Sequence, residues 1–392
     1  MTAGATNSLV DVAGLRVGHA QRVGGGYRTG TTVVLAPPGG MVAGVDVRGA
    51  APGTRETELL DPRNLVERVH AIVLTGGSAY GLSAACGVME RLADAGIGFP
   101  VEGGVVPIVP AAVIYDLGRG GAFRAVPDGS LGAEAYDAAV RSHGPDPRAR
   151  GSDGPDPWVS GSVGAGTGAV AGGLAGGIGT ASVVLPSGVT VAAMAVVNAV
   201  GSVLDPVGGR LSGTRYGLPG EFDHLREPRE DEVAAWQGAT VTSFNTTIGV
   251  VATDLALTKA QCGKLAGVAH DGLARAIRPA HTMVDGDTIF GLSTCALPFP
   301  ETTAPGAPAF AGAAGSTSAP TGAGSTSAPT GTGSAPAPVG AGRNAPGAAG
   351  LHDVLAAGAD VFSRAVAHAM LAATGRDGAP AYRDVFPSAW GK

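Results

Sequence analysis

Residues 157 to 204 contain no charged side chain, and this feature limits what the chain can fold into. The stretch is long enough to cross a bilayer as a helix. However, Pro157 and Pro186 interrupt it, and glycines are dense from Gly161 to Gly179. From Gly188 onward it reads VTVAAMAVVNAVGSVL, which is rich in β-branched residues. We therefore expect buried strands here rather than a membrane helix, and no membrane partner.

The overall composition indicates a folded and mildly acidic chain of 392 residues. Hydrophobic residues make up 44% and charged residues 15%, which is apolar enough to form a core. The length allows either two domains or one large α/β domain. The net charge of −6 argues against a nucleic-acid partner, because phosphate contacts need clustered Lys and Arg.

Cysteine usage and the N-terminal segment bear on the compartment. The three cysteines (Cys86, Cys262 and Cys295) are widely spaced and form no C-x-x-C pair, so neither a disulfide scaffold nor a thiolate zinc site is expected. The first residues, MTAGATNSLVDVAGLRV, lack the basic and apolar regions of a signal peptide. We therefore expect a mature N-terminus and a cytoplasmic protein.

Strand and helix signals alternate along the chain. Ser78 and Thr258 are candidate N-caps of two of the helices, and Gly96 is a candidate helix end. We expect two strands within residues 30–48, separated by the turn Pro37–Gly40, and polar loops at 143–157 and 205–238. The further expected strands are 70–77, 108–117, one beginning at 248 and one at 287, and the expected helices are 78–96, 132–142, 259–277 and 351–373.

Residues 303–349 differ from the rest, since Ser, Thr, Ala, Pro and Gly dominate them. STSAPTGAG at Ser316 is followed by STSAPTGTG at Ser325. Such a segment cannot form a core and is expected to be a flexible linker. The apolar helix expected at 351–373 needs a surface to pack on. We therefore expect 1–302 and 350–392 to form one catalytic domain, with 303–349 as an insert.

Several common catalytic motifs are missing from the sequence. No serine lies in a G-x-S-x-G nucleophile elbow, and there is no P-loop. The glycine run 161–179 does not have the spacing of a dinucleotide fingerprint. The histidines show no H-x-H or H-x-x-x-H pair, and a lone histidine such as His281 is more often structural than catalytic.

The sequence Asn245-Thr246-Thr247 at the start of an expected strand offers a different chemistry. A threonine hydroxyl is a poor nucleophile unless a base lies close to it. If the chain is cut before the threonine, the new α-amino group can be that base, because its pKa is about 7.7–8.0. The same hydroxyl could perform the cut by attacking the carbonyl of residue 245. Without further support, however, these residues would be read as an ordinary strand start.

The segment Met283-Val284-Asp285-Gly286-Asp287 is a second candidate. Asp-Gly-Asp is a common turn, and the further oxygen ligands of a calcium loop are missing. Two carboxylates separated by one residue could instead orient and polarise a nucleophile.

Several long motifs, in the right order, resemble the P1 (S58) peptidases. This is the family of D-aminopeptidase/esterase, β-peptidyl aminopeptidase and 6-aminohexanoate-oligomer hydrolase. The resemblance implies an α+β fold, a four-layer αββα sandwich of the N-terminal-nucleophile type. The motifs are GVDVRGAAPGTRETELLDP at Gly44, HAIVLTGGSAYGL at His70, PAAVIYDLG at Pro110, GSVGAGTGA at Gly161, VVNAVGSVLDP at Val196, NTTIGVVATD at Asn245 and RPAHTMVDGDTIF at Arg278.

The resemblance also implies a mechanism. The precursor would cut itself between Asn245 and Thr246, and the products 1–245 and 246–392 would stay associated. Thr246 would then act as the nucleophile on amide or ester bonds of small peptides or aminoacyl derivatives, with no metal or organic cofactor. Processed heterodimers would assemble into a homo-oligomer. In the matching positions, Asp285 and Asp287 would orient the nucleophile, while Tyr115 and Asn198 would line the site and donate to the oxyanion.

Two further positions qualify this assignment. Asp116, beside Tyr115, is a weak candidate for binding the amine of the substrate. The polyamide-hydrolase branch of the family has a lysine in the active site where this chain has Gly173, and no lysine precedes Lys259. Either an arginine from elsewhere supplies the cation, or the site works without one. Two alternatives stay open: an acyltransferase of the ornithine acetyltransferase type, and an unprocessed, non-catalytic homologue.

Overall fold

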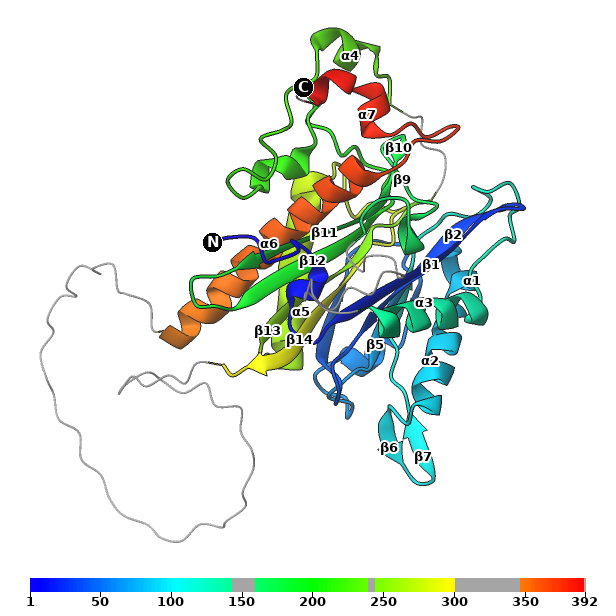
Figure 1. Ribbon diagram of the computed structural model, residues 1–392, viewed down its shortest axis with the longest axis vertical. Coiled ribbons are helices and arrows are strands. Elements are labelled where there is room, and N and C mark those ends of the chain that lie inside the picture. The colour runs from blue at the N-terminus through cyan, green and yellow to red at the C-terminus, as the bar shows by residue number, and fades with distance from the viewer. Residues whose placement is uncertain (143–158, 239–243, 300–345, 391–392) are drawn as a thin grey trace, which may run out of the picture.

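The computed structural model describes residues 1–142, 159–238, 244–299 and 346–390. Two five-stranded sheets face each other, and helices cover the outer face of each (Figure 1). The expected loop at 143–157 and nearly all of the insert at 303–349 lie outside the described residues.

The first sheet has the strand order β1-β2-β5-β8-β4. Its outer face packs against helices α2 and α3, and the short helix α1 precedes α2. The elements are β1 (Arg16–Gly24), β2 (Tyr27–Leu35), β4 (Thr54–Arg55), β5 (Ala71–Thr75), β8 (Ala111–Val113), α1 (Ser78–Gly81), α2 (Ala84–Asp94) and α3 (Gly129–Arg141).

The second sheet has the order β11-β12-β13-β14-β3 and packs against helices α5 and α6. Strands β13 and β14 are parallel, with α5 as the crossover helix between them, whereas the other neighbours are antiparallel. The elements are β3 (Val42–Val47), β11 (Gly177–Val184), β12 (Thr190–Val197), β13 (Ile248–Leu255), β14 (Thr288–Leu297), α5 (Lys259–Ala276) and α6 (Pro346–Ala372).

Smaller elements complete the described part of the chain. They are the strand pairs β6 (Phe99–Val101) with β7 (Gly104–Val106) and β9 (Val170–Ala171) with β10 (Leu174–Ala175), and the short helices α4 (Glu230–Ala235) and α7 (Tyr382–Val385). Single turns of 3-10 helix lie at Leu9–Asp11, Thr57–Leu60, Gly164–Gly166, Ser212–Tyr216 and Pro387–Ala389.

Strand β12 explains why the central stretch carries no charge. All of its residues are buried. Ala192, Met194 and Val196 face the core between the two sheets, while alternate residues face the core under α5 and α6. A strand that is apolar on both faces needs a layer on each side, so the layers run helix, sheet, sheet, helix. The four-layer αββα architecture implied by the resemblance is confirmed.

Helix α6 meets by length and composition the criteria for crossing a membrane, over Gly350–Ala372. In this fold, 72% of that window is buried, and the helix packs against α5, β11 and β12. A Cβ built on Gly179 of β11 would lie 2.1 Å from the carbonyl oxygen of Ala365 in α6. Glycine therefore allows the helix to approach the sheet closely. The expectation that this helix needs a packing surface is confirmed.

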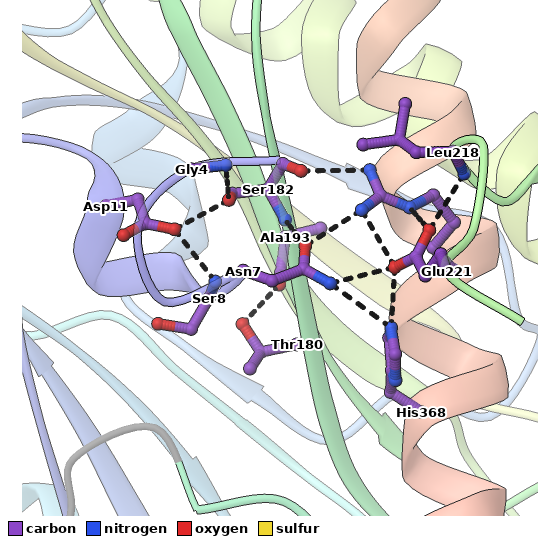
Figure 2. Close-up of polar contacts among 11 residues, drawn as sticks. Gly4, Asn7, Ser8, Asp11, Thr180, Ser182, Ala193, Leu218, Glu221 and His368 are labelled. Carbon is purple, nitrogen blue, oxygen red and sulfur yellow. Dashed lines mark hydrogen bonds and ion pairs between the residues drawn. The ribbon is translucent and has the colours of Figure 1, made fainter. Parts of the chain in front are cut away.

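A buried polar network ties the N-terminal segment to α6 (Figure 2). Arg364 of α6 donates to Glu221, to the side-chain oxygen of Asn7 and to the carbonyl of Ser182 on β11. His368, one turn further along α6, also contacts Glu221. The network thus connects residues from both ends of the chain.

The structure also differs from several sequence-based expectations. Strands β1, β6 and β7 were not expected. The turn Pro37–Gly40 does separate two strands, but it carries the chain from the first sheet (β2) to the second (β3). The helix expected from Ser78 is two helices, and Ser78 does not cap the first. Gly77 is the N-cap, with φ +81°, and its N–H donates to Asp116. Thr258 does cap α5, as expected.

Candidate active site

Sheet topology brings the two sequence motifs together. Strands β13 and β14 are parallel with Ile248 opposite Thr288, so the residues that precede them lie side by side. Asn245 pairs with Asp285 in a parallel bridge. Strand β12 runs antiparallel to β13, which places Asn198, just after β12, at the same end of the sheet. Three strand ends therefore converge on Thr246.

Thr246 is 5% exposed, and both its backbone N–H and its hydroxyl form hydrogen bonds. Its backbone N–H donates to the carbonyl of Asn198 at 2.7 Å. Its hydroxyl Oγ1 donates to the carbonyl oxygen of Asn245 at 2.5 Å. This carbonyl belongs to the peptide bond that joins Asn245 to Thr246. A Cβ built on Gly286 would lie 2.9 Å from this hydroxyl, so the glycine leaves the space that Oγ1 occupies.

The two aspartates hold the strand ends in place. Asp287 accepts the N–H of Thr247 on Oδ1 at 2.8 Å, and on Oδ2 the N–H of His281 and its ring Nδ1 at 3.0 and 2.9 Å. Asp285 accepts from the backbone and the hydroxyl of Thr282 through Oδ2. Its Oδ1 is buried and has no hydrogen-bond partner among the described residues.

Arg119 places a cation beside Asn245, where the sequence offers no lysine. Its Nη2 donates to the side-chain oxygen of Asn245 at 2.8 Å. Its Nη1 donates to the carbonyl of Gly168 at 2.7 Å and to the side-chain oxygen of Asn198. Gly173, in contrast, lies between β9 and β10 with φ +91°, a conformation that would strain a lysine. An arginine from another loop therefore lies beside the expected cut.

A cavity of about 300 Å³ opens onto Thr246. Tyr115 and Phe244 line it, with their rings tilted at 46° and 6.0 Å apart. The remaining lining residues are small, and they come from the 51–53 segment, the start of α1 and β8: Ala51, Pro52, Gly53, Ser78, Ala79 and Val113. The cavity thus accepts a small group next to the hydroxyl. Tyr115 lies at the wall of this space.

Asn198 contacts Thr246 through its main chain, while its side chain faces the neighbouring loops. Its amide nitrogen donates to the carbonyl of Tyr115 at 3.2 Å, which uses one of its two N–H groups. Its side-chain oxygen accepts from Val170 N at 3.0 Å as well as from Arg119. Asn198 therefore links the loop after β8 to the segment that contains Thr246.

Asp116 lies behind the site and does not line the cavity. Its carboxylate accepts from Thr29 Oγ1 at 2.7 Å and from Gly77 N at 2.6 Å. Burial raises the pKa of Asp116, although these hydrogen bonds and Arg119 oppose the change. With both oxygens engaged, Asp116 anchors the loop that carries Arg119.

The charges around this loop are dominated by arginines. Burial lowers the pKa of Arg119, which Asp116 partly offsets. Burial together with the nearby charges of Arg119 and Arg28 lowers the pKa of Arg376 to about 10. Arg119 and Arg376 both donate to the carbonyl of Gly168. Among the residues that the structure describes, no cluster of three His, Cys, Asp or Glu side chains could hold a metal ion.

Sequence reasoning did not identify Arg119, nor the pairing of His281 with Asp287. A signal for Arg119 exists in hindsight, since it lies in the glycine-rich LGRGG directly after Tyr115 and Asp116. His281 has φ +58°, which is unusual for a residue other than glycine.

The profile of Peptidase family S58 matches residues 7–382. The chain belongs to this family. An uncharacterized aminopeptidase of Mycobacterium tuberculosis is 46% identical to this S58 chain over 397 aligned positions, which cover 98% of the chain and 99% of that protein. A 6-aminohexanoate-oligomer endohydrolase of a Kocuria species is 31% identical and covers 74% of the chain and 76% of that protein. The S58 chain is therefore a hydrolase with aminopeptidase or amidohydrolase activity.

Solved structures support the fold assignment. A β-aminopeptidase from a Burkholderia species matches with a TM-score of 0.61 at 21% identity, covering 99% of the S58 chain and 95% of the other. The L-aminopeptidase D-Ala-esterase/amidase of Ochrobactrum anthropi, described as a variant of the Ntn-hydrolase fold, has the same TM-score at 19% identity and the same coverage. The S58 chain has this fold.

Proposed function

We propose that this chain is a self-processing N-terminal-nucleophile hydrolase that cuts itself between Asn245 and Thr246. Thr246 then cleaves amide or ester bonds of small peptides or aminoacyl derivatives. The observation that carries the proposal is the contact between Thr246 Oγ1 and the carbonyl oxygen of Asn245. The hydroxyl lies beside the peptide bond that it would attack, in a buried site braced by two aspartates.

In the processing step, Oγ1 attacks the carbonyl carbon of Asn245 and forms an ester. The bond to Thr246 N breaks, and the hydroxyl proton passes to this nitrogen, which becomes an amine. Water hydrolyses the ester, which leaves a carboxylate on Asn245 and a free hydroxyl on Thr246. The carbonyl of Asn198, which accepts from Thr246 N, then holds the new amine next to Oγ1.

In the catalytic step, this amine takes the proton of Oγ1 as the oxygen attacks the substrate carbonyl. Tyr115, which lines the cavity beside Thr246, is the donor we propose for the oxyanion. The Asn198 side chain instead contacts the carbonyl of Tyr115, the N–H of Val170 and Arg119. The proton passes to the leaving amine or alcohol, and water hydrolyses the acyl ester on Thr246. The small cavity next to Thr246 favours a small substrate.

Two neighbouring threonines provide a matched test. Thr246→Val removes the proposed nucleophile. Thr247→Val removes a hydroxyl that is buried and has no partner in the described parts of the chain. The intact masses of both variants and the wild type are measured under denaturing conditions. We expect two fragments, one beginning at Thr246, from the wild type and from Thr247→Val. We expect one full-length chain from Thr246→Val. A wild type that is folded and uncut would refute the proposal.

A further inference from the structure

We propose that Arg119 selects the acyl residue of the substrate, so that the enzyme prefers asparaginyl and aspartyl derivatives over aliphatic ones. This inference rests on the proposed function, because it treats Asn245 as the enzyme's first substrate. The acyl site is defined here as the position that Asn245 occupies, between Arg119, Val284 and Thr246.

Asn245 shows what the acyl site binds. It is 3% exposed, so water is excluded from the contacts around it. Its N–H donates to the carbonyl of Val284 at 3.2 Å, and its side-chain oxygen accepts from Arg119. Its carbonyl lies against Thr246 Oγ1. The amine, side chain and reacting carbonyl of an acyl residue therefore each have a counterpart on the protein.

Arg119 is fixed in place independently of Asn245. Its Nη1 bonds to Gly168 and Asn198 hold the guanidinium from the other side. A Cβ built on the adjacent Gly120 would lie 2.2 Å from the backbone of Tyr27, so this glycine lets the loop pack against the turn between β1 and β2. When the cut chain end leaves the acyl site, Nη2 keeps its position and loses the only acceptor it has in the described structure.

A buried donor without an acceptor carries a free-energy penalty. A substrate that leaves Nη2 without an acceptor therefore binds less well than one that supplies an oxygen. An asparaginyl or aspartyl group places an oxygen where Asn245 had one. A leucyl group has the same branched shape but offers no acceptor. A site built around a hydrogen bond rejects an analogue that cannot form it. The loss of a hydrogen bond to a charged group corresponds to a decrease of roughly 10- to 100-fold in kcat/KM.

The local charge favours an aspartyl group as well. The guanidinium groups of Arg119 and Arg376 share the Gly168 carbonyl, and Arg28 also lies near enough to lower the pKa of Arg376. Asp116 is the acidic group that faces Arg119 from its own loop. A carboxylate oxygen at the position of the Asn245 side-chain oxygen would therefore meet the Arg119 guanidinium directly.

The free amine of an aminopeptidase substrate also fits this position. At the place of Asn245 N it would donate to the Val284 carbonyl. Asp285 pairs with Asn245 in the parallel bridge and keeps one buried oxygen without a partner among the residues described. An ammonium group here would thus lie at the strand end that pairs with Asp285.

The test uses the processed wild-type enzyme and the p-nitroanilides of L-asparagine, L-aspartate and L-leucine. We expect kcat/KM for the asparagine and aspartate compounds to exceed that for the leucine compound at least 10-fold. Equal or faster cleavage of the leucine compound by the cut enzyme would overturn the inference and leave the proposed function intact. A chain that is never cut and cleaves none of the three would instead refute the proposed function.

Two arginine variants then locate the selectivity. In Arg119→Met, the asparagine-to-leucine ratio should fall to near 1, and in Arg119→Lys it should recover in part. Arg376→Met is the matched control, because Arg376 donates to backbone carbonyls rather than to Asn245. It should keep the asparagine-to-leucine ratio and lower only the aspartate-to-asparagine ratio. If Arg119→Met is not cut, the kcat/KM values of the wild-type enzyme for the asparagine and leucine compounds decide whether the inference holds. An unchanged ratio in a cut Arg119→Met enzyme would also overturn the inference.

Discussion

Arg364 donates from Nε and Nη2 to the two carboxylate oxygens of Glu221, at 2.7 and 2.9 Å (Figure 2). Both side chains are buried. Burial alone would raise the pKa of Glu221, but the hydrogen bonds from His368 and Arg364 outweigh it and hold the pKa well below its ordinary value. Glu221 and Arg364 lie on opposite sides of the proposed cut, so this ion pair joins the two future chains.

Removing one member of this pair should be severely destabilising. Arg364→Met leaves a buried carboxylate without its main partner, and we expect a loss of about 3–5 kcal/mol. The measurement is urea unfolding in the Thr246→Val background, where one chain unfolds. The double variant Arg364→Met/Glu221→Gln removes the uncompensated charge and should recover part of the loss. A single variant that loses less than about 1 kcal/mol would contradict the buried pair.

Asp287 should control processing through its three accepted hydrogen bonds. In Asp287→Asn the charge is lost and one side-chain atom becomes a donor, so the bonds from Thr247 and His281 cannot all persist. Hydrogen bonds to a charged group are worth about 1.5–3 kcal/mol, so we expect processing to slow by roughly 10- to 100-fold. A time course of chain cleavage after a pulse of synthesis measures this rate. Unchanged cleavage would remove Asp287 from the mechanism.

Variants at two glycines test the packing around Thr246. A Cβ built on Gly286 would lie 2.5 Å from the carbonyl oxygen of Ala51 and 2.9 Å from Thr246 Oγ1, so Gly286→Ala should slow processing at least 10-fold. Gly263→Ala in α5 is the control, because its Cβ meets no atom within 4 Å. Alanine in a helix is favoured by about 0.5–1 kcal/mol, so this variant should be cut normally and unfold at higher denaturant. If Gly286→Ala is cut at the normal rate, the space beside Thr246 Oγ1 is not as tight as the structure indicates.

His270 should make stability depend on pH. Burial lowers the pKa of His270 to about 4, against an ordinary value of 6.5. Between these values the unfolded chain binds the proton and the folded chain does not. The contribution of His270 to stability should therefore fall as the pH decreases from 6.5 to 4, by at most about 1.4 kcal/mol per pH unit. Burial also lowers the pKa of His19 to about 4, so His19 adds a contribution of the same sign. His270→Gln can keep the contact to the Asp46 carbonyl and should reduce the slope of this part of the profile. An identical pH profile in wild type and variant would contradict the assignment.

The sequence motifs predicted Thr246 as the nucleophile and Asp285 and Asp287 as its neighbours, but not the other residues around them. Asn245 and Asp285 pair because β13 and β14 are parallel, and the strand–helix–strand pattern from 248 to 288 is evident in the sequence. The Arg119 contact to Asn245 spans 126 residues of sequence. It depends on how the glycine loop after β8 packs against the β1–β2 turn, which no local pattern encodes.

The same distinction holds for the fold. Apolar runs and caps predicted most of the central strands and the helices α2, α3, α5 and α6. The Pro37–Gly40 turn predicted a break between two strands, yet a turn does not specify which sheet the next strand joins. That choice is set by burial. Val34 of β2 and Ala43 of β3 face the same inter-sheet core from opposite sides.

The strand order of the second sheet has a consequence for when the chain can be cut. Strands β13 and β14 come from one side of the Asn245–Thr246 bond, and they lie between β12 and β3, which come from the other side. Neither half can complete the sheet alone, and the N–H of Thr246 reaches the carbonyl of Asn198 only after the halves have interleaved. On the proposed mechanism, cleavage therefore depends on folding: only a molecule with a complete second sheet releases the amine of Thr246, and a misfolded one stays an uncut precursor.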